Sequence, residues 1–167
     1  MSGEEEEVNK DYAVENAVLG LDYHVGSRTL AYCSANNKVF LQTLSDNVGK
    51  FQKPVRVLRG HKNEVNAVCW AELDVPSEPT LFSASEDKSI RSWFPGEEGL
   101  RLFVDAGGAV TSLCWDRTEN LLLASVEHVV KYGFLQEAAS TNAHPSPQKY
   151  SLLIVIVFCP KLFLARR

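Results

Sequence analysis

The chain has 167 residues, of which 45% are hydrophobic and 23% charged, and it carries a net charge of −4. This length and composition predict one globular domain with a sizeable core. The mildly acidic balance, with no basic and aromatic-rich patch, argues against a protein that binds nucleic acid.

The first residues of the chain are acidic. Met1, Ser2 and Gly3 are followed by four glutamates, Glu4 to Glu7. The run is not a signal peptide. A block of like charge is typical of a solvated, disordered segment, so we expect residues 1–12 to form an acidic tail.

A pattern of short apolar runs then begins, and its first unit covers residues 13–47. The run Val18–Tyr23 is followed by a second apolar run, Leu30–Ala35. A polar turn over Asn36–Lys38 leads to a third run, Val39–Leu41. Short apolar runs separated by polar turns predict β-strands.

The second unit, residues 55–98, carries the most specific pattern. A Gly60-His61 pair precedes the stretch Glu64–Trp70, which is apolar on both alternating faces and therefore predicts a strand buried on both sides. A tight polar turn at Ser85–Lys88 predicts a hairpin, and Trp93 ends the strand that follows it.

The third unit, residues 100–135, repeats parts of the second. Leu113-Cys114-Trp115 follows Val68-Cys69-Trp70 at a distance of 45 positions. Each triplet is followed by a loop and another apolar run, Leu81–Ser85 and Leu121–Ser125. Recurrence at this spacing indicates a repeat architecture.

The order of these elements resembles the WD40 repeat, which forms the four-stranded blade of a β-propeller. The resemblance implies an all-β fold of about three blades, an incomplete propeller because complete rings have roughly 4–8 blades. A C-terminal tail outside the propeller is expected to follow. The outer units depart from the pattern, with Asn37 in the first unit and Glu127 in the third near the place of the family's Asp.

The family's hydrogen-bonded set of His, Ser or Thr, Asp and Trp matches His61, Ser85, Asp87 and Trp93. In such a set the carboxylate accepts from the imidazole, the ring bridges to the hydroxyl, and the hydroxyl accepts from the indole. Each neutral bond contributes about 1 kcal/mol, and more where the Asp is charged. We therefore expect His61 to be structural, rather than a metal ligand or a catalytic base.

Proteins of this family are mostly rigid platforms, so the resemblance implies a protein–protein interaction scaffold or adaptor. The loops that face partners lie on one rim of the propeller, and the matching residues here are Lys62, Asn63, Glu64, Glu86 and Lys88. These residues carry both charge signs and could select a partner by complementary charge. The alternative interpretation is that they are solvated turn residues. Self-association through open blade edges is also expected.

Sequence signatures of chemistry are missing. The chain has no phosphate-binding loop and no nucleophile elbow, and its four histidines lack metal-ligand spacing. Asp22 and His24 are the nearest approach to an acid–imidazole pair, and chance adjacency explains them. No catalytic residue, metal or cofactor is therefore expected, and the chain is predicted not to be an enzyme.

The cysteines predict the compartment. Cys33, Cys69, Cys114 and Cys159 are far apart and form no C-x-x-C motif. Cys69 and Cys114 hold equivalent places in the repeat, where a free cysteine is a small core residue. Free thiols fit a reducing compartment, the cytoplasm or the nucleus.

The pattern stops after Leu135. Residues 136–150, with Pro145 and Pro147, predict a linker, and residues 151–167 form a hydrophobic tail. This tail has three interpretations: a strand added to the last blade, a membrane anchor, or a segment foreign to the propeller in a truncated or alternatively spliced product.

The anchor would make the chain a membrane-attached WD40-like protein. The apolar stretch at 151–165 is shorter than the roughly 20 residues that a spanning helix needs, and it contains Lys161. The foreign segment is the favoured interpretation, with the added strand close behind.

Overall fold

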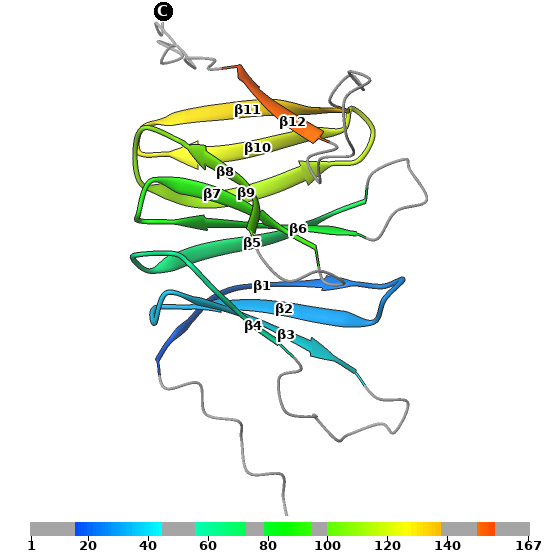
Figure 1. Cartoon of the computed structure of the whole chain (residues 1–167). Helices are drawn as coiled ribbons and strands as arrows, with labels where there is room; N and C mark the ends of the chain where they lie inside the picture. Colours follow the sequence, from blue (N-terminus) through cyan, green and yellow to red (C-terminus); the bar gives the residue numbers. More distant parts are fainter. Residues whose placement is uncertain (1–15, 45–55, 73–78, 95–99, 138–149, 156–167) are drawn as a thin grey trace, which may run out of the picture.

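In a computed structural model, the described residues are 16–44, 56–72, 79–94, 100–137 and 150–155, and they form strands and turns without a helix. The twelve strands form three antiparallel sheets of four (Figure 1). This arrangement confirms the predicted all-β fold. The expected acidic tail, most of the expected linker and residues 156–167 lie outside the described residues.

Each sheet is a meander, in which neighbouring strands follow one another along the chain. The first sheet consists of β1 (Val18–His24), β2 (Thr29–Ser34), β3 (Lys38–Thr43) and β4 (Arg56–Arg59). The second sheet consists of β5 (Val65–Ala71), β6 (Thr80–Ser85), β7 (Ser89–Trp93) and β8 (Leu100–Asp105). The third sheet consists of β9 (Val110–Asp116), β10 (Leu121–Val126), β11 (Val129–Glu137) and β12 (Tyr150–Val155).

The sheets stack face to face, with the second sheet between the other two (Figure 1). Their first strands lie along one side of the stack, where β1 packs against β5 and β5 packs against β9. The second sheet is therefore covered on both faces, and all six residues of β6 are buried. The double burial predicted for the Glu64–Trp70 stretch is confirmed at Val65 and at Val68–Trp70.

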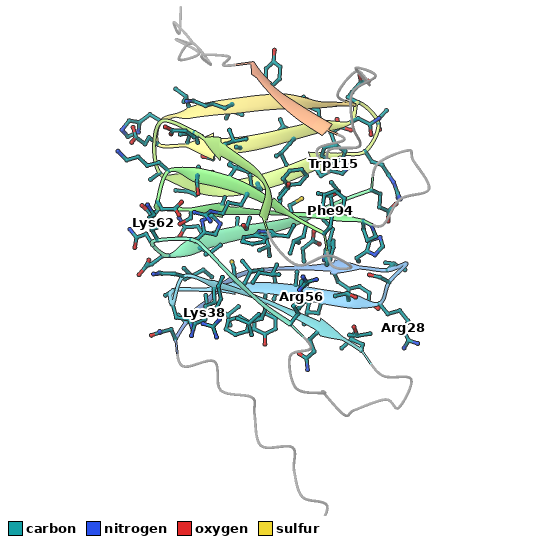
Figure 2. All side chains as sticks on the ribbon, viewed as in Figure 1. Arg28, Lys38, Arg56, Lys62, Phe94 and Trp115 are labelled. Atoms are coloured by element: carbon teal, nitrogen blue, oxygen red, sulfur yellow. The ribbon has the colours of Figure 1, made fainter. Side chains whose placement is uncertain are left out.

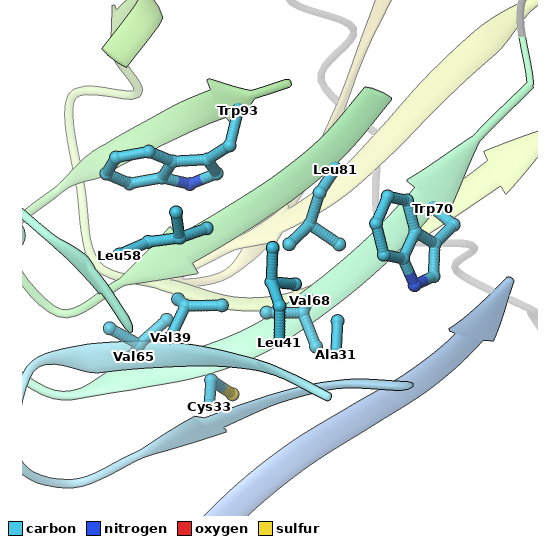
Figure 3. Packing of buried hydrophobic residues seen from close by; sticks show 10 residues of the cluster. All are labelled: Ala31, Cys33, Val39, Leu41, Leu58, Val65, Val68, Trp70, Leu81 and Trp93. Atoms are coloured by element: carbon cyan, nitrogen blue, oxygen red, sulfur yellow. The ribbon is translucent and has the colours of Figure 1, made fainter. Parts of the chain in front are cut away.

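Two hydrophobic clusters hold the stack together. The first lies between the first and second sheets and is formed by Ala31, Cys33, Val39, Leu41, Leu58, Val65, Val68, Trp70, Leu81 and Trp93 (Figure 3). The second lies between the second and third sheets and includes Phe82, Ile90 and Leu122. Alternate residues of the second sheet thus enter opposite clusters, as the period of a strand requires.

The sheets are offset from the units of the sequence. Strand β4 lies in the second unit, yet it hydrogen-bonds to β3 and completes the first sheet. Strand β8 likewise begins the third unit and completes the second sheet. The second and third units therefore each give their first strand to the preceding sheet, which links neighbouring sheets through the backbone.

The start of the hydrophobic tail is a strand of the third sheet. Residues Tyr150–Val155 pair with β11 in an antiparallel register that runs from Glu137–Tyr150 to Tyr132–Val155. This is the placement that the added-strand interpretation expects. Among the residues with described positions, no helix is long and apolar enough to cross a membrane.

Candidate functional site

A chain of hydrogen bonds crosses the second sheet from its loop end to its core. The His61 imidazole, in the loop between β4 and β5, has Nδ1 3.0 Å from Asp87 Oδ2 and Nε2 2.7 Å from Ser83 Oγ. The Trp93 indole N–H donates to the same Ser83 oxygen at 2.8 Å. The structure therefore joins three of the four predicted residues, His61, Asp87 and Trp93.

Ser83 is the fourth member of this hydrogen-bonded network, so the bridging role predicted for Ser85 is wrong. Both serines lie on the same face of β6, because they are two residues apart. Ser85 lies nearer the turn, where its hydroxyl donates to the Asn63 carbonyl at 3.1 Å and accepts from the Asp87 amide at 3.0 Å. Its place near the turn puts it in contact with the loops, rather than with the indole of Trp93.

The Asp87 carboxylate is the most heavily bonded group of the site. It accepts from the backbone amides of Lys62 at 2.9 Å and Ser89 at 3.0 Å, and from the Ser89 hydroxyl. Arg91 Nη2 lies 3.6 Å from it. Burial alone would raise the pKa of Asp87, but the hydrogen bonds from Ser89, Lys62 and His61 outweigh burial and hold it at about 2.

The proton positions in the chain follow from these partners. Burial lowers the pKa of His61, and this effect exceeds the opposing influence of Asp87, so the ring is neutral near pH 7. A neutral imidazole has one donor, and a carboxylate can only accept. Nδ1–H therefore donates to Asp87, Nε2 accepts from the Ser83 hydroxyl, and the Ser83 oxygen accepts from Trp93.

This hydrogen-bonded chain occurs in the second sheet alone among the described residues. In the first sheet Asn36 occupies the place of Asp87, two residues after the end of β2, so the alignment of Asn37 with that place is wrong. Asn37 instead matches Lys88, and both have left-handed backbones with φ of 65° and 67°. In the third sheet two residues, Glu127 and His128, connect β10 to β11, so no residue matches Asp87.

The five predicted rim residues lie together at one end of the stack. The side chains of Lys62, Asn63, Glu64 and Lys88 are exposed. The Glu86 amide donates to the Glu64 carbonyl at 3.0 Å, which holds the two loops side by side. Lys38, from the first sheet, lies at the same end as Lys62, and Arg28 lies at the opposite end (Figure 2).

Glu86 has a structural role that the sequence did not indicate. Its side chain is half-buried, and Oε1 accepts from Asn66 Nδ2 at 2.8 Å. The same Asn66 amide donates to the Val110 carbonyl of the third sheet at 2.9 Å. Glu86 therefore helps to hold two sheets together as well as lying on the rim.

The opposite end of the stack has a polar cluster that spans all three sheets. His24 Nε2 lies 3.1 Å from Glu72 Oε1, and the other oxygen of Glu72 pairs with Arg117. Burial, with Arg117 as a smaller influence, lowers the pKa of His24. Asp22, two residues before His24 in the sequence, accepts from the backbone amide of Trp70 at 2.7 Å. Both residues of this pair thus make structural contacts between sheets.

Several residues of the site were missed in the sequence. Ser83, Ser89 and Arg91 all contribute to the buried network. Each lies two residues from another polar member, the spacing of one strand face: Ser83 from Ser85, Ser89 from Asp87, and Arg91 from Ser89. That spacing was the available signal. In the described part of the chain no group of three or more His, Cys, Asp or Glu side chains is placed to hold a metal ion.

Comparison with known proteins identifies the repeat. Residues 52–93 match the family model "WD domain, G-beta repeat", which confirms the predicted WD40 repeat in the second unit. The WD repeat-containing protein WDS homolog of Arabidopsis thaliana is 34% identical over 87 residues, which are 52% of this chain and 14% of that protein. WD40 repeat proteins are generally interaction scaffolds.

The fold also matches a solved structure. A chain in the crystal structure of the mitotic checkpoint complex has a TM-score of 0.60 and 19% sequence identity, over 83% of this chain and 40% of that chain. At this identity the likeness shows the fold, that of stacked propeller blades. The chain thus spans well under half the length of both proteins with which it is compared.

Proposed function

We propose that the chain is an adaptor or scaffold that binds other proteins at the rim formed by the β4–β5 loop and the β6–β7 turn. The observation that carries this proposal is the position of the Asp87 carboxylate. This carboxylate accepts a hydrogen bond from the Lys62 amide of the loop at 2.9 Å and one from the Ser89 amide after the turn at 3.0 Å. The loop and the turn are therefore held together. A satisfied buried network of this kind stiffens the backbone around it.

The rim offers charge that is not used inside the fold. Lys62, Glu64 and Lys88 are exposed, and both signs lie within two neighbouring loops. Exposed charges of this type contribute to the choice of partner and to the rate of association. A protein surface with a complementary pattern of acidic and basic groups is the expected partner.

Other features fit the same role. The solved chain of similar fold belongs, by its title, to a complex. The described cysteines are free, and Cys33 and Cys69 are buried, which supports a reducing compartment such as the cytoplasm or the nucleus. The proposal includes neither catalysis nor nucleic-acid binding, and it includes self-association through the open ends of the stack.

Attachment to a membrane through residues 151–167 has less support. Residues Ser151–Val155 hydrogen-bond to β11 as a strand, and this pairing would have to break before the segment could enter a bilayer as a helix.

Charge reversal on the rim tests the proposal. Proteins captured from cells by the wild-type chain are compared quantitatively with those captured by a Lys62→Glu, Lys88→Glu double variant. Glu119→Lys, an exposed reversal in the β9–β10 turn at the opposite end, is the matched control. We expect a defined set of proteins to be lost from the rim variant and kept by the control. Identical capture by all three chains would overturn the proposal.

A further inference from the structure

The outer face of the first sheet exposes residues at positions that are buried elsewhere in the stack. Leu21 is the fourth residue of β1, opposite Tyr32, and it is 67% exposed. Val68 is the fourth residue of β5, opposite Ser83, and it is 7% exposed because the first sheet covers it. Leu21 is therefore placed to be covered in the same way by another sheet.

The surroundings of Leu21 are those of an internal blade face. Tyr32 and Phe40 pair across β2 and β3 on this outer face, and their rings stack with centroids 5.0 Å apart. Tyr23 is exposed, and it holds the sixth place of β1, as Trp70 does in β5. Tyr32 is only 8% exposed and Phe40 is half-buried, so Leu21 and Tyr23 are the aliphatic and aromatic groups that this outer face presents, at register positions suited to sheet-on-sheet packing.

The outer face of the third sheet also exposes a residue whose equivalents in the other two sheets are buried. Val39, Ile90 and Val130 are each the second residue of the third strand in their sheet. The first two are 1% and 4% exposed because the next sheet covers them, whereas Val130 is 45% exposed. Val130 therefore lacks the neighbour that its equivalents have in the described part of the chain.

The contacts between adjacent sheets inside the stack show which hydrogen bond a further sheet would form. The fifth residue of a first strand accepts from the backbone amide of the sixth residue in the next sheet. Asp22 accepts in this way from Trp70 at 2.7 Å, and the Cys69 sulfur accepts from the Trp115 amide. The equivalent residue of the third sheet is Cys114, the fifth residue of β9, and it is exposed. The first sheet holds an aromatic residue, Tyr23, at the matching position, where its backbone amide donates to Asp22 Oδ1 at 2.8 Å.

We infer that a second copy of this chain covers both faces at once. The outer face of the third sheet in each copy packs on the outer face of the first sheet in the other. Two stacks of three sheets then close into a ring of six blades, within the roughly 4–8 blades of known propellers. A head-to-tail interface whose rotation closes gives a ring with two-fold symmetry. This geometry specifies the self-association in the proposed function and assigns it to sheet faces, rather than to strand edges.

The test uses one charged residue on each face. Leu21→Asp and Val130→Asp are purified separately, beside the wild-type chain and Thr118→Asp, an exposed control in the β9–β10 turn. Mass is measured by light scattering on a sizing column, and circular dichroism verifies that each variant is folded. Tyr23→Asp replaces Leu21→Asp if the latter does not fold.

The ring predicts twice the chain mass for the wild type and the control, and a single chain mass for each variant alone. An equimolar mixture of the two variants is expected to regain dimers, because one junction in the mixed pair has both faces intact. A monomeric wild type or a ladder of larger species would overturn the inference. Loss of dimer in only one of the two variants would also overturn it, since that result indicates like faces pairing.

The outcome is independent of the rim. The Lys62→Glu, Lys88→Glu double variant is expected to keep the dimer mass, because the rim charges are not in either junction. Failure of the rim proposal and failure of the ring are therefore separate results.

Discussion

His61 Nδ1 lies 3.0 Å from Asp87 Oδ2, and this contact joins the β4–β5 loop to the β6–β7 turn. Both side chains are almost fully buried. The pair links the loops of the proposed partner-binding rim to the Ser83 and Trp93 contacts in the core. Stability and rim geometry are consequently coupled in the second sheet.

Replacing His61 by Ala is expected to destabilise the fold by about 1–3 kcal/mol, because it removes one hydrogen bond from each of the buried partners Ser83 and Asp87. Urea unfolding followed by circular dichroism measures the change. Glu64→Ala, an exposed neighbour on the same loop, is the control and is expected to change stability by less than about 0.5 kcal/mol. Equal stability of His61→Ala and wild type would contradict the assigned network.

Ser83 and Ser85 are distinguished by a double-mutant cycle with Trp93→Phe. Ser83→Ala and Trp93→Phe remove the two ends of one 2.8 Å hydrogen bond, so their effects are expected to be non-additive by about 0.5–3 kcal/mol. Ser85→Ala breaks contacts with Asn63 and Asp87 instead, so its effect should add to that of Trp93→Phe. Strong coupling at Ser85 and none at Ser83 would restore the sequence-based assignment.

Acid should weaken the fold through Asp87. Its pKa is about 2 in the fold, below its ordinary value of 3.8, so folding favours the ionised form. The resulting stability is present above pH 3.8 and is lost as the pH falls toward 2, because the unfolded chain binds the proton more readily. Asp87→Asn lacks this contribution. The stability difference between wild type and Asp87→Asn should therefore shrink over that window, and a constant difference would contradict the assignment.

His61 adds a second pH dependence. Burial lowers its pKa below 6.5, so the unfolded chain binds a proton first and stability falls as the pH drops below that value. His24 has the same direction of shift and contributes similarly. His61→Gln should therefore flatten the stability profile just below pH 6.5, as measured by thermal unfolding across pH. An unchanged slope would assign the effect to other groups.

The Glu72 cluster is expected to contribute little to stability. Glu72 is partly exposed, and solvent screens such pairs, so Glu72→Gln should cost less than about 1 kcal/mol. Because Glu72 touches both His24 and Arg117, the loss should shrink at high salt. Glu119→Gln, an exposed carboxylate outside the cluster, is the control. A loss that does not depend on salt would indicate a packing role instead.

The sequence predicted the strand pattern because each apolar run has the two-residue period of a strand and recurs in a fixed order. It could not separate Ser83 from Ser85, since both lie on one face of β6 and differ only in their distance from the turn. Asn36 and Asn37 presented the same ambiguity, which the length of the turn resolves in the structure. The pairing of Tyr150–Val155 with β11 depends on a contact across an intervening segment, and no local pattern encodes it.

An incomplete propeller is expected to expose the apolar faces of its outer blades, but the local sequence does not show which residues lie on those faces. Leu21 and Val68 are both apolar and hold the same place in the pattern, so the pattern does not distinguish them. Their different exposure follows from the number of sheets beside them, a property of the stack rather than of the strand.

The central claim, that the rim binds partner proteins, is tested most directly by titration calorimetry with one captured partner. The wild-type chain and Glu119→Lys are expected to bind with equal affinity. The Lys62→Glu, Lys88→Glu variant is expected to bind at least about 10-fold more weakly, a loss of roughly 1.4 kcal/mol that falls with added salt. Equal affinity for all three chains would contradict the account.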